Sequence, residues 1–80
     1  MNNRIKEYFI KSFYCAVYLK LCGFDPNRIE ATQKNKKIFF YENSEELQNL
    51  IQDFYNNSIL QNFIEKMIQF RKELYETKTN

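Results

Sequence analysis

The first long apolar segment predicts a helix that is apolar on almost every side. Residues 13–22 are apolar except at Lys20. Ser12 is typical of a helix N-cap, and Gly23 is typical of the left-handed residue that ends a helix. A helix without a polar face either lies centrally in its domain or is shared with a partner. We therefore expect residues 13–22 to form the central helix.

The segment before this helix allows two interpretations. Phe9 and Phe13 have helical spacing, whereas Tyr8 and Ile10 alternate as in a strand. Ser12 is better suited to a cap than to a helix interior. The sequence therefore favours a short extended segment that leads into the helix.

A β-hairpin is predicted next. Residues 24–27 form a turn around Pro26, and residues 28–32 alternate polar and apolar, as a half-buried strand does. Residues 37–41 are rich in β-forming side chains and are apolar on both faces. The polar residues 33–36 connect the two strands, and we expect helices to cover one face of the hairpin.

Two helices follow the hairpin. Asn43 and Glu46 have the spacing of a capping box, and the helix that they start carries a narrow apolar stripe. Residues 55–58 break this helix, and a last helix is predicted from about Ser58 to Glu76.

These elements predict an α+β fold in a single small domain. Their order is a short extended segment, a helix, a β-hairpin and then two helices. The domain spans residues 1–80, with frayed ends at about 1–4 and 77–80.

The last helix carries more apolar surface than a domain of this size readily buries. At about 100° per residue, its apolar side chains cover roughly half of the circumference, with Arg71 near the middle. This arc predicts self-association, as a dimer, through Phe63, Met67 and Phe70. The alternative is ordinary core packing, with Arg71 reaching past the end of the core.

Charge is unevenly distributed along the 80 residues. Residues 1–40 carry eight basic and three acidic side chains, a net of +5, and residues 41–80 carry four basic and seven acidic, a net of −3. The basic side chains of the hairpin could contact the phosphates of a nucleic acid. An alternative is that lysines on an exposed edge strand prevent aggregation. The candidate nucleic-acid residues are Arg28, Lys34, Lys36 and Lys37.

The residue types needed for catalysis are scarce. The chain has no His and one Gly, so it lacks a Ser–His or Cys–His couple and a Gly-rich phosphate loop. Cys15 and Cys22 lie about 10.5 Å apart on one helix, too far for a disulfide, and we expect both to be buried free thiols. No catalytic residue, metal or cofactor is predicted.

Composition suggests a source and a compartment. Asn, Lys, Ile, Phe and Tyr make up 41 of the 80 residues, and AT-rich codons encode these amino acids. The source expected is a low-GC bacterium, or a phage or mobile element within one. Neither a signal peptide nor an apolar run of membrane-spanning length is seen. We expect a cytoplasmic protein that does not bind membranes.

From Ser12 to Tyr75 the sequence resembles a small uncharacterised domain family of low-GC bacteria and their prophages. The resemblance implies the same architecture and a mobile-element context, and it carries over no catalytic or binding residue. The matching segments are Ser12, Ala16–Leu19, Cys22–Phe24, Phe39–Leu47, Phe54–Asn57 and Lys72–Tyr75.

The sequence therefore favours a non-enzymatic protein-binding module, encoded by a phage or mobile element, that inhibits or modulates a host macromolecular system. A defence nuclease such as a CRISPR effector is one target, and the transcription or replication machinery is another. The expected contacts with this protein complex are Arg71 and Tyr75, then Lys36 and Lys37. The alternatives are a small nucleic-acid-binding protein that uses the basic hairpin, and a self-associating structural module.

Overall fold

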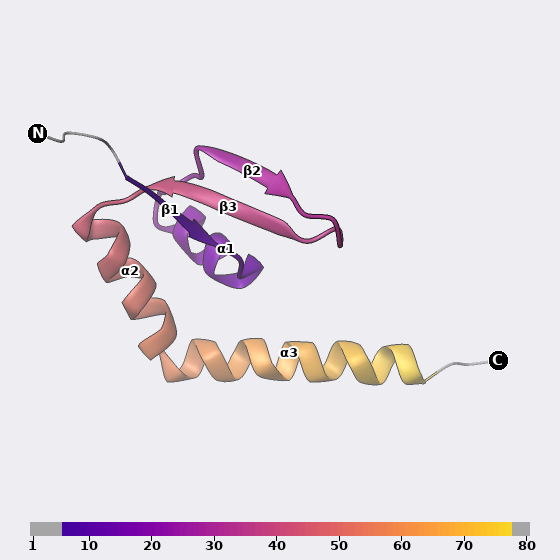
Figure 1. Cartoon of the computed structure of the whole chain (residues 1–80). Helices are drawn as coiled ribbons and strands as arrows, with labels where there is room; N and C mark the ends of the chain where they lie inside the picture. Colours follow the sequence, from indigo (N-terminus) through magenta and orange to yellow (C-terminus); the bar gives the residue numbers. More distant parts are fainter. Residues whose placement is uncertain (1–5, 78–80) are drawn as a thin grey trace, which may run out of the picture.

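The computed structural model describes residues 6–77, which form three helices and a three-stranded sheet (Figure 1). The predicted α+β class and element order are confirmed. In chain order the elements are β1 (Glu7–Ile10), α1 (Phe13–Leu21), β2 (Arg28–Ala31), β3 (Lys37–Glu42), α2 (Glu45–Asn56) and α3 (Ser58–Glu76).

The sheet contains one strand more than the predicted hairpin. β3 is central and pairs antiparallel with β2 on one side and with β1 on the other. The extended lead-in is thus a strand, and it places Tyr8 opposite Tyr41 and Ile10 opposite Phe39. Because successive side chains alternate between faces, these four side chains share one face of the sheet.

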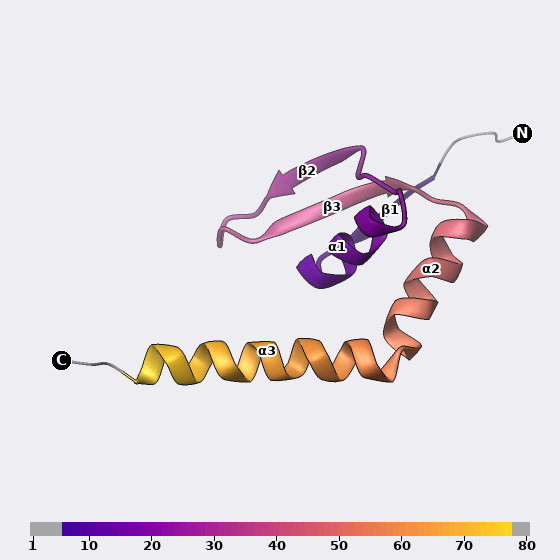
Figure 2. The ribbon, with the colours of Figure 1, turned by 180° about the vertical axis from the view of Figure 1, so that it is seen from behind.

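A small core joins that face to α1 and α2, which lie on the same side of the sheet (Figure 2). Tyr41, Leu19, Leu47 and Cys15 are the largest side chains that are fully buried. Burying a Leu-sized side chain contributes about 1.5–3 kcal/mol. The core cluster consists of Ile10, Cys15, Leu19, Tyr41, Leu47 and Phe54.

α1 is central in the fold but buries only one of its two apolar sides. Cys15 and Leu19 face the sheet and are inaccessible to solvent. One apolar row on the other side follows i, i+4, i+8 spacing: Phe13 is 62% exposed, Val17 48% and Leu21 81%. The sequence pattern could not separate a helix buried all round from one with a second, open face.

α3 begins at Ser58, as predicted, and Asn57 is its N-cap. Two other local expectations are wrong. The N-cap of α2 is Ser44 and not Asn43: the Ser44 Oγ accepts from the Leu47 N–H at 3.1 Å, while Asn43 accepts from the Gln48 side chain. β2, predicted to be half-buried, is exposed along its whole length, because it is an edge strand with no helix beneath it.

α3 projects from the rest of the molecule as a 19-residue arm (Figure 1). None of its residues is buried. The radius of gyration is 15.9 Å, whereas a compact domain of this length has about 12 Å. No helix within residues 6–77 is both long enough and apolar enough to cross a membrane.

The frayed ends predicted for residues 1–4 and 77–80 lie outside the described residues except at Thr77. Thr77 is the C-cap of α3, and both its N–H and its hydroxyl donate to the Glu73 carbonyl, at 2.9 and 2.8 Å. The helix therefore has a defined end at this residue.

Tyr41 generates the first testable prediction. Its ring is 1% exposed, and its hydroxyl is buried without a hydrogen-bond partner among the described residues. A buried unsatisfied polar group costs about 1–3 kcal/mol. We expect Tyr41→Phe to be at least as stable as the wild type, and up to about 2 kcal/mol more stable, in urea denaturation.

The matched control is Tyr8→Phe, because Tyr8 lies opposite Tyr41 but is 36% exposed and should change stability little. A loss of more than about 1 kcal/mol in Tyr41→Phe alone would mean that the hydroxyl has a partner in solution.

Candidate partner-binding site

An open groove between α1 and α3 is the main candidate site. We call it the apolar groove; its volume is about 460 Å³. Phe54 of α2 also lines it, and Leu60, Ile64 and Met67 of α3 are half-buried along it. The remaining lining side chains are Phe13, Tyr14, Val17, Tyr18 and Leu21 from α1, and Phe63 and Arg71 from α3.

The groove unites some of the sequence-predicted residues but not all. Phe63, Met67 and Arg71 line it together. Phe70 and Tyr75 lie on α3 but do not line the groove, and they are 60% and 77% exposed. The sequence left open that the all-apolar α1 is shared with a partner, but it named no residue of α1 as a contact, whereas five α1 side chains line the groove.

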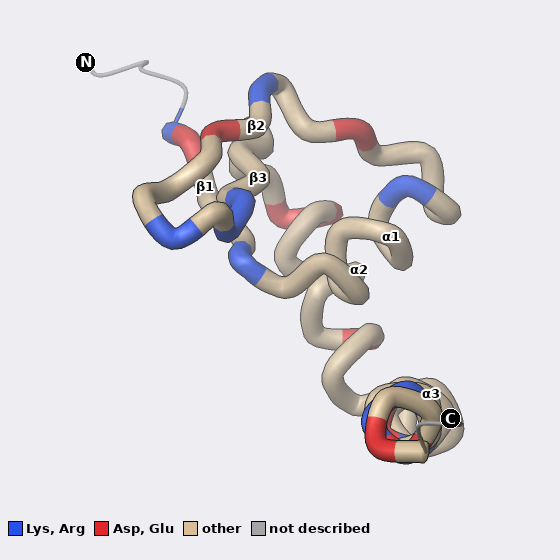
Figure 3. The backbone as a smooth tube through the Cα atoms, turned by 90° about the vertical axis from the view of Figure 1, so that its right-hand side faces the viewer, with Lys and Arg blue, Asp and Glu red and all other residues tan. Residues whose placement is uncertain are grey.

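A second candidate surface lies at the hairpin tip, where lysines gather (Figure 3). Lys34, Lys36 and Lys37 line a hollow of about 500 Å³ together with Lys11, Thr32 and Ile38. We call it the lysine hollow. The Thr32 hydroxyl accepts hydrogen bonds from the backbone N–H groups of Lys34 and Lys36, and Asn35 between them has φ +63°. A hydrogen-bonded turn therefore holds the backbone of these lysines in place.

Lys11 was not predicted as part of this set. It directly follows β1, and the pairing of β1 with β3 carries it beside the hairpin. The sequence predicted an extended segment before the first helix, but it did not predict that this segment pairs with the hairpin. Local sequence patterns do not reveal strand pairing between distant segments.

Arg28 does not join the lysines. It lies near the other end of β2 and forms ion pairs with Glu7 and Glu30, the latter at 2.9 Å from Nε. The hydrogen bonds that the guanidinium donates to Glu7, and then to Glu30, raise its pKa. The guanidinium also stacks on the Phe40 ring, with its central carbon 4.0 Å from the ring centre. The charge of Arg28 is thus balanced on the outer face of the sheet.

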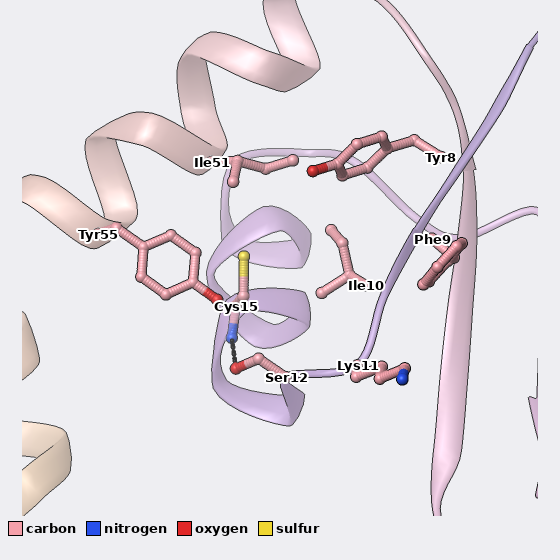
Figure 4. Close-up of a pocket in the computed structure, with 8 residues that line it drawn as sticks. All are labelled: Tyr8, Phe9, Ile10, Lys11, Ser12, Cys15, Ile51 and Tyr55. Carbon is pink, nitrogen blue, oxygen red and sulfur yellow. Dashed lines mark hydrogen bonds between the residues drawn. The ribbon is translucent and has the colours of Figure 1, made fainter.

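A third cavity, of about 520 Å³, lies between β1, α1 and α2 (Figure 4). Cys15 lines it beside Ser12 and Tyr55, and the Ser12 hydroxyl accepts from the Cys15 N–H at 3.1 Å. Burial raises the pKa of the Cys15 thiol to about 11. At neutral pH the thiol is protonated, and a protonated thiol is a poor nucleophile.

The two cysteines are free, as predicted, but they differ in environment. Cys15 is buried, whereas Cys22 is exposed because it caps α1 at the surface, so the expectation that both are buried is wrong. Across residues 6–77, no three side chains of His, Cys, Asp or Glu come together in a way that could hold a metal ion.

A family described as Domain of unknown function (DUF5659) matches residues 5–76. No curated protein and no solved structure is significantly similar to the chain.

The cysteines generate the second prediction. At pH 8 and under native conditions we expect iodoacetamide to modify Cys22 and to leave Cys15 unmodified, with both modified after denaturation, as measured by mass spectrometry of the peptides. The folded-state pKa of Cys15 lies above its ordinary value of 9.0. Its contribution to stability is therefore present below about pH 9 and is lost as the pH rises towards 11. Equal labelling of both thiols in the native protein would contradict the burial of Cys15.

Proposed function

Because the chain belongs to the DUF5659 family, whose function is unknown, we propose its function from its surface: it is a non-enzymatic protein-binding module. The apolar groove carries this proposal. The groove is lined almost entirely by apolar side chains. One of its walls is the long helix α3, which has no buried residue.

The exposed apolar surface is large for a chain that acts alone. Contiguous apolar patches on monomers rarely exceed a few hundred Å². At roughly 150–250 Å² per aromatic side chain, the exposed parts of Phe13 and Phe63 offer about 250 Å² at the groove. Phe70 and Tyr75, elsewhere on α3, add a similar area. With the exposed aliphatic side chains of α1 and α3, the surface approaches the roughly 800 Å² that each partner buries in a stable complex.

The shape of the groove suits a helix from the partner. Two helices wall the groove, and a third helix laid between them would bury both walls as in a helical bundle. Phe63 and Met67 would then anchor the contact. Arg71 is the one charged side chain among the described lining residues, and Arg is enriched where partners bind most tightly.

We further propose that the partner is a host macromolecular complex and that the module inhibits or modulates it on behalf of a phage or mobile element. The high content of amino acids that AT-rich codons encode and the lack of a catalytic residue set support this proposal. A defence nuclease such as a CRISPR effector is one candidate target, and the transcription or replication machinery is another. The proposed contacts remain Arg71 and Tyr75 on α3, with Lys36 and Lys37 at the hairpin tip.

Self-association is the second candidate function. Each copy offers a groove and an arm, so a two-fold pair could seat the arm of each copy in the groove of the other. The area estimated above approaches what each copy would bury in such a dimer. Both candidates use the same surface, so each needs its own experiment.

We expect the tagged protein to capture a specific complex from the lysate of a low-GC bacterial host, and to bind the purified captured protein directly. The double variant Arg71→Glu/Tyr75→Ala should lose at least about 90% of this binding, since it removes two of the proposed contacts. The matched control is Gln69→Glu, which alters the polar side of α3 and should retain binding. Recovery of the same proteins by all three forms would refute the proposal.

Light scattering at micromolar concentration tests the second candidate. If the protein is a structural dimer, we expect twice the monomer mass for the wild type and the monomer mass for Phe63→Glu and Met67→Glu, because each change places a charge in the apolar groove. Gln69→Glu should remain dimeric. A monomeric wild type would exclude self-association and leave the proposed binding of another protein intact.

A further inference from the structure

We infer that the segment which the apolar groove receives is an acidic amphipathic helix, with its apolar side in the groove and its carboxylates towards the lysine hollow. This inference rests on the proposed protein-binding function and adds the chemistry of the partner. It depends on the groove and the hollow forming one continuous surface of a single charge sign.

The two surfaces meet at the β1–α1 connection. Lys11 lines the lysine hollow, and Phe13, two residues further on, lines the apolar groove. Two residues span at most about 7 Å between their Cα atoms. The hairpin tip and the free end of α3 also point to the same side of the molecule (Figure 1).

Every charge on this combined surface is positive. The hollow contributes Lys11, Lys34, Lys36 and Lys37, and the groove contributes Arg71. Of the described residues, no Asp or Glu lines either surface, and the first turn of α1 between them has no acidic side chain.

Two cations outside this combined surface, Lys20 and Arg28, are neutralised by ion pairs. Lys20 pairs with Asp25 at 2.6 Å, and Arg28 pairs with Glu7 and Glu30. No ion pair is found for the lysines of the hollow among the described residues, so their charge is available to a partner. Complementary charge speeds association and selects the partner.

The apolar groove argues against nucleic acid as the ligand. A phosphate backbone could contact the lysines, but it has no apolar side to bury against Val17, Leu60 and Met67. An acidic amphipathic helix can bury apolar side chains in the groove and, at the same time, place carboxylates near the lysines of the hollow.

A second copy of the chain fits less well. Its α3 could fill the groove, but that helix carries three basic and three acidic side chains and so has no net charge to match the lysines. The basic residues are Lys66, Arg71 and Lys72, and the acidic residues are Glu65, Glu73 and Glu76.

Two synthetic peptides provide the test. Each has about 18 residues, enough for about 27 Å of helix, and both carry the same Leu and Phe stripe at i, i+3, i+4, i+7 spacing. One has Glu on its polar side and the other has Lys. Fluorescence anisotropy with the full chain should show the Glu peptide binding at least about tenfold more tightly at about 50 mM salt, with the preference shrinking at about 500 mM.

Protein variants assign the effect to the two surfaces. Lys34→Gln/Lys36→Gln/Lys37→Gln should remove the preference for the Glu peptide, whereas Val17→Glu should weaken both peptides, because Val17 lies on the groove wall and is already half-exposed. Lys20→Gln is the matched control, since Lys20 lies outside both surfaces and should leave the affinities unchanged. Circular dichroism verifies that each variant is folded.

Three results would overturn the inference. Equal affinity for both peptides would remove the acidic preference and leave the protein-binding function standing. Binding of a DNA or RNA duplex that depends on the lysines but not on Val17 would assign the hollow to nucleic acid. Failure to bind either peptide, together with a dimeric wild type, would assign the groove to a second copy.

Discussion

The corner at Asn57 sets the shape on which the proposed site depends. Asn57 ends α2 and begins α3: its side chain accepts from the Leu60 N–H at 2.9 Å, and its own N–H donates to the Phe54 carbonyl. The Gln61 side chain donates to the same carbonyl at 2.7 Å, so both helices are tied to one turn. Because Phe54 is held in the core, the corner is anchored, and α3 leaves it to run beneath α1. The apolar groove is the space that this turn creates.

The small core and the open apolar surface are two results of one distribution of side chains. α1 has nine residues and two apolar sides, and the sheet can cover only one of them. The first half of α3 is attached to the rest of the domain through Leu60, Ile64 and Met67, which are half-buried. The second half of α3 does not pack against any other described part of the chain. This second half is shorter than the roughly 12–15 residues below which an isolated helix is marginal in water, so a partner that covers α3 would also stabilise it.

Local chemistry made most of the fold predictable. Ser12, Gly23 and Pro26 bound the first helix and the turn after it, and the half-circumference apolar arc of α3 indicated a helix that its own domain could not cover. Long-range contacts were not accessible in this way. The pairing of β1 with β3, the position of Lys11 beside the hairpin and the neutralisation of Arg28 by Glu7 all join residues more than twenty positions apart. The sequence shows that α1 has apolar side chains on two sides. Whether the second side is exposed depends on where α3 lies, and the sequence does not show that.

The central position of β3 has a consequence for the order of folding. Pairing of Ala31 with Lys37 closes a loop of a few residues, whereas pairing of Ile10 with Phe39 must enclose all of α1 and β2. The longer closure costs roughly 1–2 kcal/mol more in chain entropy. The hairpin can therefore nucleate before β1 docks, and until that docking one edge of β3, with Phe39 and Tyr41, stays unpaired. A newly made chain is therefore most prone to associate with a second unfolded chain before β1 pairs with β3.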